Sequence, residues 1–355
     1  MRNLTGPARW ALQMRLAMRK SPDGALQKRM ETTVSPYAPA GWCAGVRRTD
    51  GSTEFAFGGE AIRSETAVSR DTIFRVASVS KVITAAAAAS LARAGKLDLD
   101  GDAGEMFGFP IRLAITPRQL LTHTAALSDD AYNRAAETGN FPPLNELIRK
   151  SFAAWKPGER FAYSNLGAGV AGMLVEKTAE MPFDDYVRRA FFQPYGLDAS
   201  FHPQRIAEKE KLANCYRVPG YALAYDARKI AAQPPDETID PLRHYNVPAG
   251  KLMISAPALL ETLVRLAREY PELYEPQGKS GRGLGMAITR GVFRRNATIV
   301  GYQGVAYGAV CEAWLNPEDG AAAVLLTNGA KMRSTGALQH IGQDGVAALF
   351  DFAYE

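Results

Sequence analysis

Residues 74–94 read Phe-Arg-Val-Ala-Ser-Val-Ser-Lys-Val-Ile-Thr-Ala-Ala-Ala-Ala-Ala-Ser-Leu-Ala-Arg-Ala, and this stretch decides the fold. Five consecutive alanines leave almost no polar surface for water, so the sequence predicts a helix over Ser78 to Ala94 that is packed on all sides. Ser78 and Lys81 stand at its entrance, three residues apart. This spacing places both side chains on one helical face, with the lysine amine within reach of the serine hydroxyl.

The Ser-x-x-Lys pair has the chemistry of an activated nucleophile. Serine reacts poorly without a neighbouring base, and lysine serves as one when burial or nearby positive charge lowers its pKa. The spacing by itself is close to chance, and Ser78 or Ser80 could simply cap the helix. A lysine beside five alanines must be desolvated, however, which favours a functional interpretation.

A second motif follows at Lys156 to Asn165, which reads Lys-Pro-Gly-Glu-Arg-Phe-Ala-Tyr-Ser-Asn. The proline and glycine predict a turn that presents Tyr163 and Asn165 two residues apart. Tyr163 could relay a proton, and Asn165 could hold a substrate carbonyl or the amine of Lys81.

Strand patterns lie at both ends of the chain, and helical patterns lie between them. A hairpin is predicted from Gly41 to Phe57, and three further strands are expected at 298–307, 309–315 and 321–327, followed by a helix over 339–352. The sequence therefore predicts an α/β (α+β) fold with a central antiparallel sheet flanked by helices. We assign residues 31–99 and 246–355 to this domain, residues 100–245 to an inserted, mostly helical domain, and residues 1–30 to a basic leader.

The charge distribution excludes several classes of protein. The net charge is +5 over 355 residues, but residues 1–30 alone hold seven basic residues against Asp23, so the remainder is about neutral. A nucleic-acid-binding surface is not supported, and no apolar stretch approaches the ~20 residues of a membrane helix. Arginines interrupt the one candidate secretory segment, which indicates a cytoplasmic protein. The leader could associate with a membrane surface or a partner helix, but a solvated segment is the favoured interpretation.

The sequence contains no motif for a metal site, a disulfide framework or an α/β-hydrolase. The four histidines are far apart without metal-ligand spacing, so we expect no metal and no cofactor. The three cysteines form no C-x-x-C pair and are expected to be buried free thiols. No G-x-S-x-G elbow is present, which removes the basis for an α/β-hydrolase. A small molecule or a peptide is therefore the expected partner.

Together, residues 74–81, residues 115–124 (Ile-Thr-Pro-Arg-Gln-Leu-Leu-Thr-His-Thr) and Tyr163-Ser164-Asn165 resemble the serine β-lactamase and penicillin-recognising superfamily. The similarity is to its class C β-lactamase, D,D-peptidase and esterase branch, and it runs from about Gly41 to the C-terminus. It implies a β-lactamase-like sandwich with the active site between the sheet and the helical domain. It also implies acyl transfer through a serine ester.

The resemblance assigns roles to individual residues. Ser78 becomes the nucleophile, Lys81 its activating base, Tyr163 the proton relay near the leaving group, and Asn165 a ligand of Lys81 and of the substrate amide. The choice of acylation base between Lys81 and Tyr163 stays open. The family's third motif falls on three consecutive residues in the 298–307 strand and implies that the following amide completes the oxyanion hole with that of Ser78; these substrate-binding candidates are Tyr302, Gln303, Gly304 and Val305.

Tyr302 departs from the family pattern, which has lysine or histidine there. A neutral phenol gives up a charge-assisted hydrogen bond to a substrate carboxylate, on the order of 1 kcal/mol. We therefore expect an esterase, amidase or peptidase that disfavours carboxylated substrates. A β-lactamase or D,D-carboxypeptidase is the alternative, and a non-catalytic binding protein of the same fold ranks below both.

Overall fold

The computed structural model describes residues 24–234, 240 and 242–355. Its main sheet has seven strands, and every neighbouring pair in it is antiparallel. The strands nearest the N-terminus lie directly beside those nearest the C-terminus, as predicted. In spatial order they are β3 (Thr66–Ala67), β2 (Thr53–Ile62), β1 (Gly41–Arg47), β11 (Ala322–Thr327), β10 (Ala309–Leu315), β9 (Thr298–Ala306) and β8 (Ala287–Arg290).

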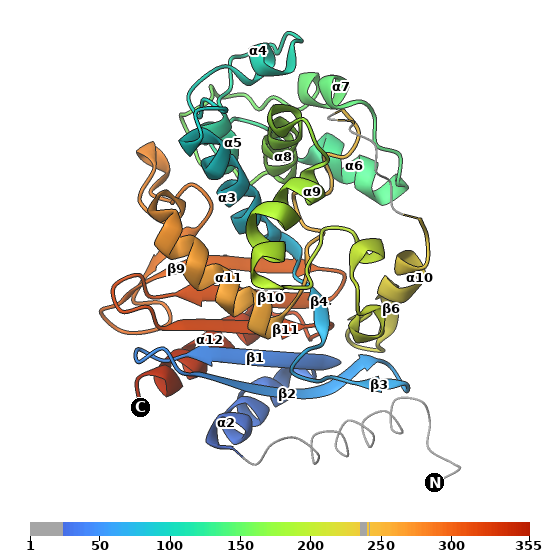
Figure 1. The fold of residues 1–355 in the computed structure, drawn as a ribbon, viewed down its shortest axis with the longest axis vertical. Coiled ribbons are helices and arrows are strands. Elements are labelled where there is room, and N and C mark those ends of the chain that lie inside the picture. Colours follow the sequence, from blue (N-terminus) through green and yellow to red (C-terminus); the bar gives the residue numbers. More distant parts are fainter. Residues whose placement is uncertain (1–23, 235–239, 241) are drawn as a thin grey trace.

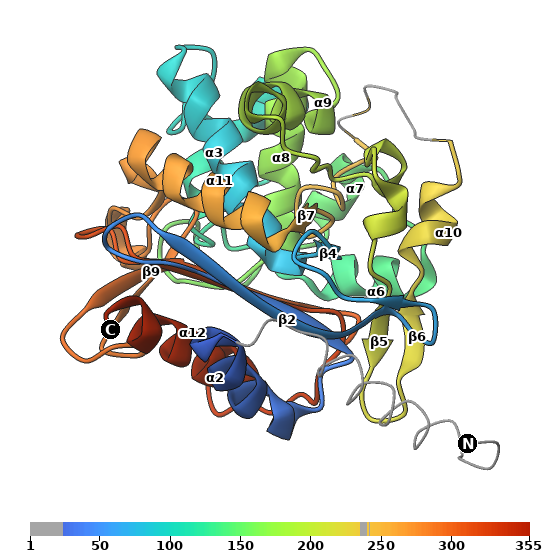
Figure 2. The same ribbon diagram turned by 60° about the horizontal axis from the view of Figure 1, so that its bottom comes forward.

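Helices cover both faces of this sheet (Figures 1 and 2). Two helices lie on the lower face, and α11 together with the helical part of the chain lies on the upper face. No helix of the described ranges is both long and apolar enough to cross a membrane. The α-helices are α2 (Ala25–Val34), α3 (Ser80–Arg93), α4 (Ala103–Phe107), α5 (Pro117–Leu121), α6 (Asp130–Thr138), α7 (Leu144–Arg149), α8 (Asn165–Ala179), α9 (Phe183–Val187), α10 (Ala227–Ala231), α11 (Ala256–Glu269) and α12 (His340–Ala353).

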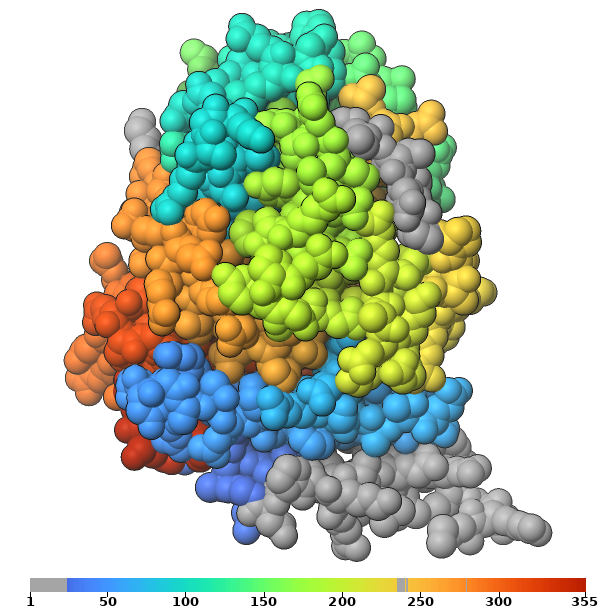
Figure 3. All heavy atoms as spheres, in the orientation of Figure 1, coloured from blue at the N-terminus to red at the C-terminus, as the bar shows by residue number. Residues whose placement is uncertain are grey.

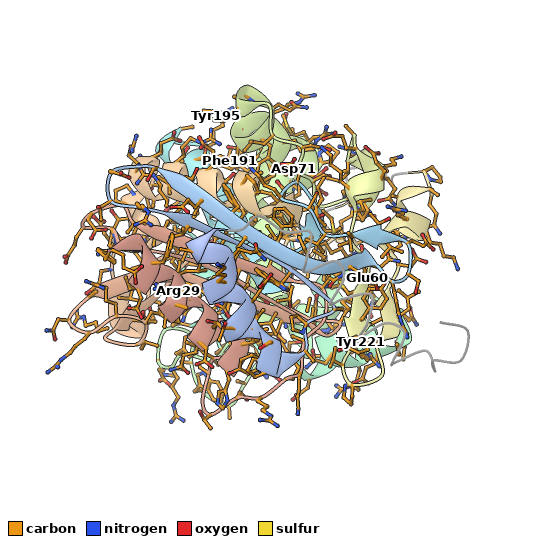
Figure 4. All side chains as sticks on the ribbon, turned by 90° about the horizontal axis from the view of Figure 1, so that it is seen from below. Arg29, Glu60, Asp71, Phe191, Tyr195 and Tyr221 are labelled. Carbon is orange, nitrogen blue, oxygen red and sulfur yellow. The ribbon has the colours of Figure 1, made fainter. Side chains whose placement is uncertain are left out.

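Helix α2 on the lower face extends across residue 30, where the predicted leader ends. Figure 4 shows α2 and α12 crossing this face side by side, with Arg29 on α2. Leu26, Met30 and Val34 recur every four residues along α2 and are fully buried against the sheet. The leader is predicted from its charge, whereas this apolar stripe packs residues 25–34 against the sheet. Its residues 1–23 lie outside the described ranges.

Helix α3 confirms the central prediction. Every residue from Ser80 to Ala89 is buried, and the five alanines allow close contact with neighbours on all sides. One hydrophobic cluster continues from the upper face of the sheet through α3 into α8 and the other helices above it. The space-filling view in Figure 3 shows the helical part resting directly on α11 and on the first strands.

Several short elements were not predicted. Strands β4 (Ile73–Arg75) and β7 (Met253–Ser255) pair in a small separate sheet, and β5 (Cys215–Arg217) pairs with β6 (Ala222–Tyr225) within the mainly helical part. Strands of three or four residues are too short to show a period.

Glu312 on β10 is a buried acid in the lower core, and it should make the stability of the protein depend on pH. It is fully buried, accepts hydrogen bonds from Gln303 Nε2 and Trp314 Nε1, and has its pKa raised to about 8 by burial. The folded state then holds a proton that the unfolded chain releases near pH 4.5. The free energy of unfolding should fall as pH rises from about 5 to 8, at up to about 1.4 kcal/mol per pH unit.

Denaturant unfolding at pH 5, 6.5 and 8 checks this expectation. The difference in slope between wild type and Glu312→Gln isolates the contribution of Glu312, because other titrating groups are common to both proteins. Parallel pH profiles would contradict the prediction.

Candidate active site

Ser78 lies in a tight turn between β4 and α3. A single 3₁₀ turn, Ala77–Val79, precedes the helix, and Ala77 has a positive φ of 47° that non-glycine residues rarely adopt. Ser80 holds the turn in place, because its Oγ donates to Ala77 O at 2.5 Å and accepts from Leu252 N at 3.1 Å. Ser80 is therefore the structural serine of the pair, and Ser78 is left free for chemistry.

Lys81 is 4% exposed and contacts three acceptors. Its Nζ lies 3.0 Å from Ser78 Oγ, 2.9 Å from Asn165 Oδ1 and 2.6 Å from the carbonyl oxygen of Ala249. The predicted proximity of the serine and the lysine is present. Three acceptors around one amine satisfy a buried cation without an acidic side chain.

Tyr163 and Asn165, at the start of α8, contact the Ser78 and Lys81 side chains. Tyr163 Oη lies 2.7 Å from Ser78 Oγ and donates to Asn165 Oδ1 at 3.0 Å. The intervening Ser164 caps α8 by accepting from Gly167 N, so its side chain points into the protein. This alternation explains the spacing, because the two outer residues face Ser78 while the middle one supports the helix.

No pattern in the sequence pointed to Asp129, although this residue holds Asn165 in place. Its carboxylate accepts from Asn165 N at 2.6 Å, Asn165 Nδ2 at 3.0 Å, Leu166 N at 3.1 Å and Ser164 Oγ at 2.8 Å. A carboxylate at a helix N-terminus is favourable because it accepts from otherwise unpaired N–H groups. Asp129 and Asn165 are 36 positions apart, and no spacing signal in the sequence links them.

We expect Asp129→Asn to lower the free energy of unfolding by about 1–3 kcal/mol, because one acceptor oxygen is replaced by a donor that faces N–H groups. Denaturant unfolding measures the loss. The adjacent Asp130→Asn is the matched control, since Asp130 is exposed and should change stability by much less. Equal losses in the two variants would contradict the assigned role.

His123 is a buried support for the site. Its Nδ1 accepts from Ser164 N at 3.2 Å, so Nε2 carries the proton and donates to Tyr302 Oη at 2.8 Å. Burial, followed by the charges of Lys81 and Arg282, holds the pKa of His123 well below its usual range. The imidazole is therefore neutral and positions Tyr302.

Tyr302 lies inside the site rather than at its rim, with 6% of its surface exposed. The guanidinium of Arg282 lies over its ring at 5.4 Å from the centroid and over the Phe161 ring at 5.3 Å. Arg282 was not predicted from the sequence. It lies on a loop outside the motif and supplies the positive charge that the Tyr302 side chain lacks. The missing charge at Tyr302 therefore disfavours carboxylated substrates less than the sequence alone suggests, because Arg282 provides a cation nearby.

The three residues after Tyr302 point to alternate faces of the sheet, as successive residues of a strand do. Gln303 faces the lower side of the sheet, where its Nε2 donates to Glu312 Oε1 and its Oε1 accepts from Gln339 N, so its side chain points away from Ser78. Gly304 faces Ser78, and a Cβ there would lie 2.2 Å from Val76 O and 2.8 Å from Ser78 N. Only glycine allows β9 to approach this closely. Val305 is 37% exposed next to it.

Curated relatives match about half of this chain. The chain is similar to the protein flp of Staphylococcus aureus strain N315 (26% identical over 173 residues, 46% of this chain and 35% of the relative). It is also similar to penicillin-binding protein 4* of Bacillus subtilis strain 168 (25% over 193 residues, 51% of this chain and 41% of the relative). The chain thus matches less than half the length of these curated relatives.

Solved structures share the fold over almost the whole chain. The D-amino acid amidase of Ochrobactrum anthropi SV3 superposes with a TM-score of 0.71 at 20% identity, covering 92% of this chain and 98% of the amidase. A class C β-lactamase of Rhodobacter sphaeroides gives 0.67 at 16% identity, covering 92% and 99%. The profile of the family described as Beta-lactamase matches residues 26–344. The chain therefore belongs to the β-lactamase family.

Proposed function

We propose that this protein is a serine acyl hydrolase that cleaves an ester, amide or peptide bond through an acyl-enzyme on Ser78. The observation that carries the proposal is the position of Ser78 Oγ, 3.0 Å from Lys81 Nζ and 2.7 Å from Tyr163 Oη. A nucleophile that touches two groups able to exchange protons is the arrangement that serine needs for attack on a carbonyl.

The reaction has two halves. Ser78 Oγ adds to the carbonyl carbon while its proton passes to the neighbouring base, and the amides of Ser78 and Val305 stabilise the oxyanion. The carbonyl re-forms, the bond to the leaving group breaks, and Tyr163 delivers the proton to that group. Water then adds to the ester, its proton returns through the same groups, and Ser78 is released with the acid product.

Two arrangements of protons fit the distances around Lys81. A neutral amine donates to Asn165 and Ala249 and accepts the Ser78 proton, which makes Lys81 the base. An ammonium donates to all three acceptors, and Ser78 then donates to Tyr163. The base is therefore either Lys81 or Tyr163, and both arrangements need Asn165 as acceptor.

The mouth of the site favours apolar groups in the substrate. Phe161, Tyr163, Val305 and Tyr307 all expose more than a third of their surface, although large apolar side chains are usually buried. Amides of D-amino acids with aromatic side chains are suitable first substrates, since one structural neighbour is a D-amino acid amidase complexed with D-phenylalanine.

Arg282 favours a second candidate activity, that of a β-lactamase or D,D-carboxypeptidase. Its guanidinium stands beside Tyr302, so a substrate carboxylate would find a cation there. Nitrocefin hydrolysis at rates comparable with p-nitrophenyl butyrate would support this activity over the esterase or amidase.

Labelling with a fluorophosphonate, read by intact-protein mass spectrometry, tests the acyl-enzyme. We expect one adduct per chain in the wild type and none in Ser78→Ala. Burst kinetics with p-nitrophenyl acetate should then show release of about one nitrophenol per enzyme before the steady state. An adduct that persists in Ser78→Ala would overturn the proposal.

Two further expectations accompany the function. The cytoplasmic location rests on the interrupted apolar segment within residues 1–30, and fractionation of the native host tests it. The division into an α/β domain (31–99 and 246–355) and a helical insert (100–245) places Ser78 on the first and Asn165 on the second, with the reaction between them.

A further inference from the structure

A buried guanidinium, two of whose three nitrogens lack an acceptor among the described residues, lies three residues before Ser78. Arg75, at the end of β4, is 8% exposed, and its guanidinium carbon lies 4.6 Å from the Tyr307 ring centroid and 5.3 Å from that of Tyr225. The two rings interact with the faces of the guanidinium, whereas its N–H groups point within its plane. Within the described ranges, Nε and Nη1 of Arg75 have no hydrogen-bond acceptor.

A second cation stands next to it. Lys251 follows Gly250, which lies against Ala77, and burial together with the charge of Arg75 lowers the pKa of Lys251 to about 8. In the described part of the chain, neither cation forms a salt bridge with an acidic side chain. Two like charges held close together away from bulk water destabilise the folded state unless an anion lies near them.

The position of this pair relative to the reaction follows from β9. Tyr302, at one end of the motif, is on the side of His123 and Tyr163, where the leaving group departs. Gly304 lies against Ser78, and Tyr307 comes three residues further on, about 10 Å beyond it. Arg75 and Lys251 thus lie on the side of Ser78 opposite to Tyr302, and we infer that the acyl half of the substrate extends toward them.

Tyr132 on α6 is close enough to Asp129, Arg75 and Tyr163 for their charges to act on its hydroxyl. Burial raises its pKa above the ordinary value, which keeps the phenol neutral and able to donate a hydrogen bond.

We propose that Arg75 and Lys251 form an anion subsite that binds a carboxylate at the far end of the acyl group. The inference rests on the proposed function and narrows it to esters or amides of dicarboxylic acids and to acyl groups of similar shape. The flat guanidinium matches the two oxygens of a carboxylate, Lys251 adds a second charge, and Tyr225 and Tyr307 flank the acyl chain. A bound carboxylate offsets the repulsion that the two cations otherwise experience.

A matched pair of esters tests the subsite. Mono-p-nitrophenyl glutarate carries the carboxylate, and its methyl ester has the same chain without the charge. We expect the wild type to prefer the acid by about tenfold or more in kcat/KM. Lys251→Met and Arg75→Gln should each reduce that preference at least several-fold, whereas Lys96→Met, which removes an exposed lysine elsewhere, should leave it unchanged.

Binding of glutarate to the Ser78→Ala protein, measured by calorimetry, gives a second readout that needs no turnover. Binding that weakens in Ser78→Ala/Lys251→Met supports the subsite, and circular dichroism verifies that each variant is folded. Equal rates for the two esters, or glutarate binding that is absent or unaffected by Lys251→Met, would overturn it. Failure of the proposed function looks different, since then neither ester turns over and fluorophosphonate leaves Ser78 unlabelled.

Discussion

Lys81→Met is expected to slow the acylation of Ser78 by about a thousandfold. Methionine keeps most of the volume of the lysine in the alanine-lined pocket, but it can neither hold nor exchange a proton 3.0 Å from Ser78 Oγ. The contact to Asn165 Oδ1 is lost at the same time, so the amide is no longer fixed from that side. Both proton arrangements around Ser78 fail without the amine.

Rapid-mixing measurement of the p-nitrophenyl acetate burst gives the acylation rate directly. Lys177→Met is the matched control, because Lys177 is an exposed lysine in the last turn of α8. Tyr163→Phe should be compared in the same experiment, and the variant with the larger loss of acylation identifies the base. A Lys81→Met enzyme that retains a tenth or more of the wild-type acylation rate would exclude any role of the amine in proton transfer.

Gly304→Ala is the second change with a large expected effect. The added Cβ would lie 2.2 Å from Val76 O and 2.8 Å from Ser78 N, and both of these neighbours are backbone atoms that cannot move aside alone. Strand β9 must therefore shift away from the turn that holds Ser78. We expect the free energy of unfolding to fall by about 1–3 kcal/mol and the acylation rate by about a hundredfold or more.

Thermal unfolding and the burst experiment together measure this change. Gly24→Ala serves as the control, since Gly24 has a negative φ and open space around the position of an added Cβ. A Gly304→Ala protein with wild-type stability and acylation would contradict the close approach of β9 to Ser78.

Much of the fold was predictable because its elements are strongly patterned. The alanine run specified the buried helix α3, and the strand patterns at 41–57, 309–315 and 321–327 indicated the strands that pair as β1–β2 and β10–β11. Short strands and the start of α2 could not be placed, since three residues show no period and the charges of the leader concealed the stripe of Leu26 and Met30. Side-chain alternation also reassigned Gln303 to the lower face, because the motif gives the order of residues but not their facing.

Local spacing by itself determined the core of the candidate site. Ser78 and Lys81 are one helical turn apart, and Tyr163 and Asn165 flank a helix cap, so short-range backbone geometry already directs each pair. Tertiary structure alone decided which distant groups complete it. Asp129 under Asn165, Arg282 over Tyr302, and Arg75 beside Lys251 meet only when loops and strands far apart in the chain pack together, and charges that meet in this way leave no periodic signal in a sequence.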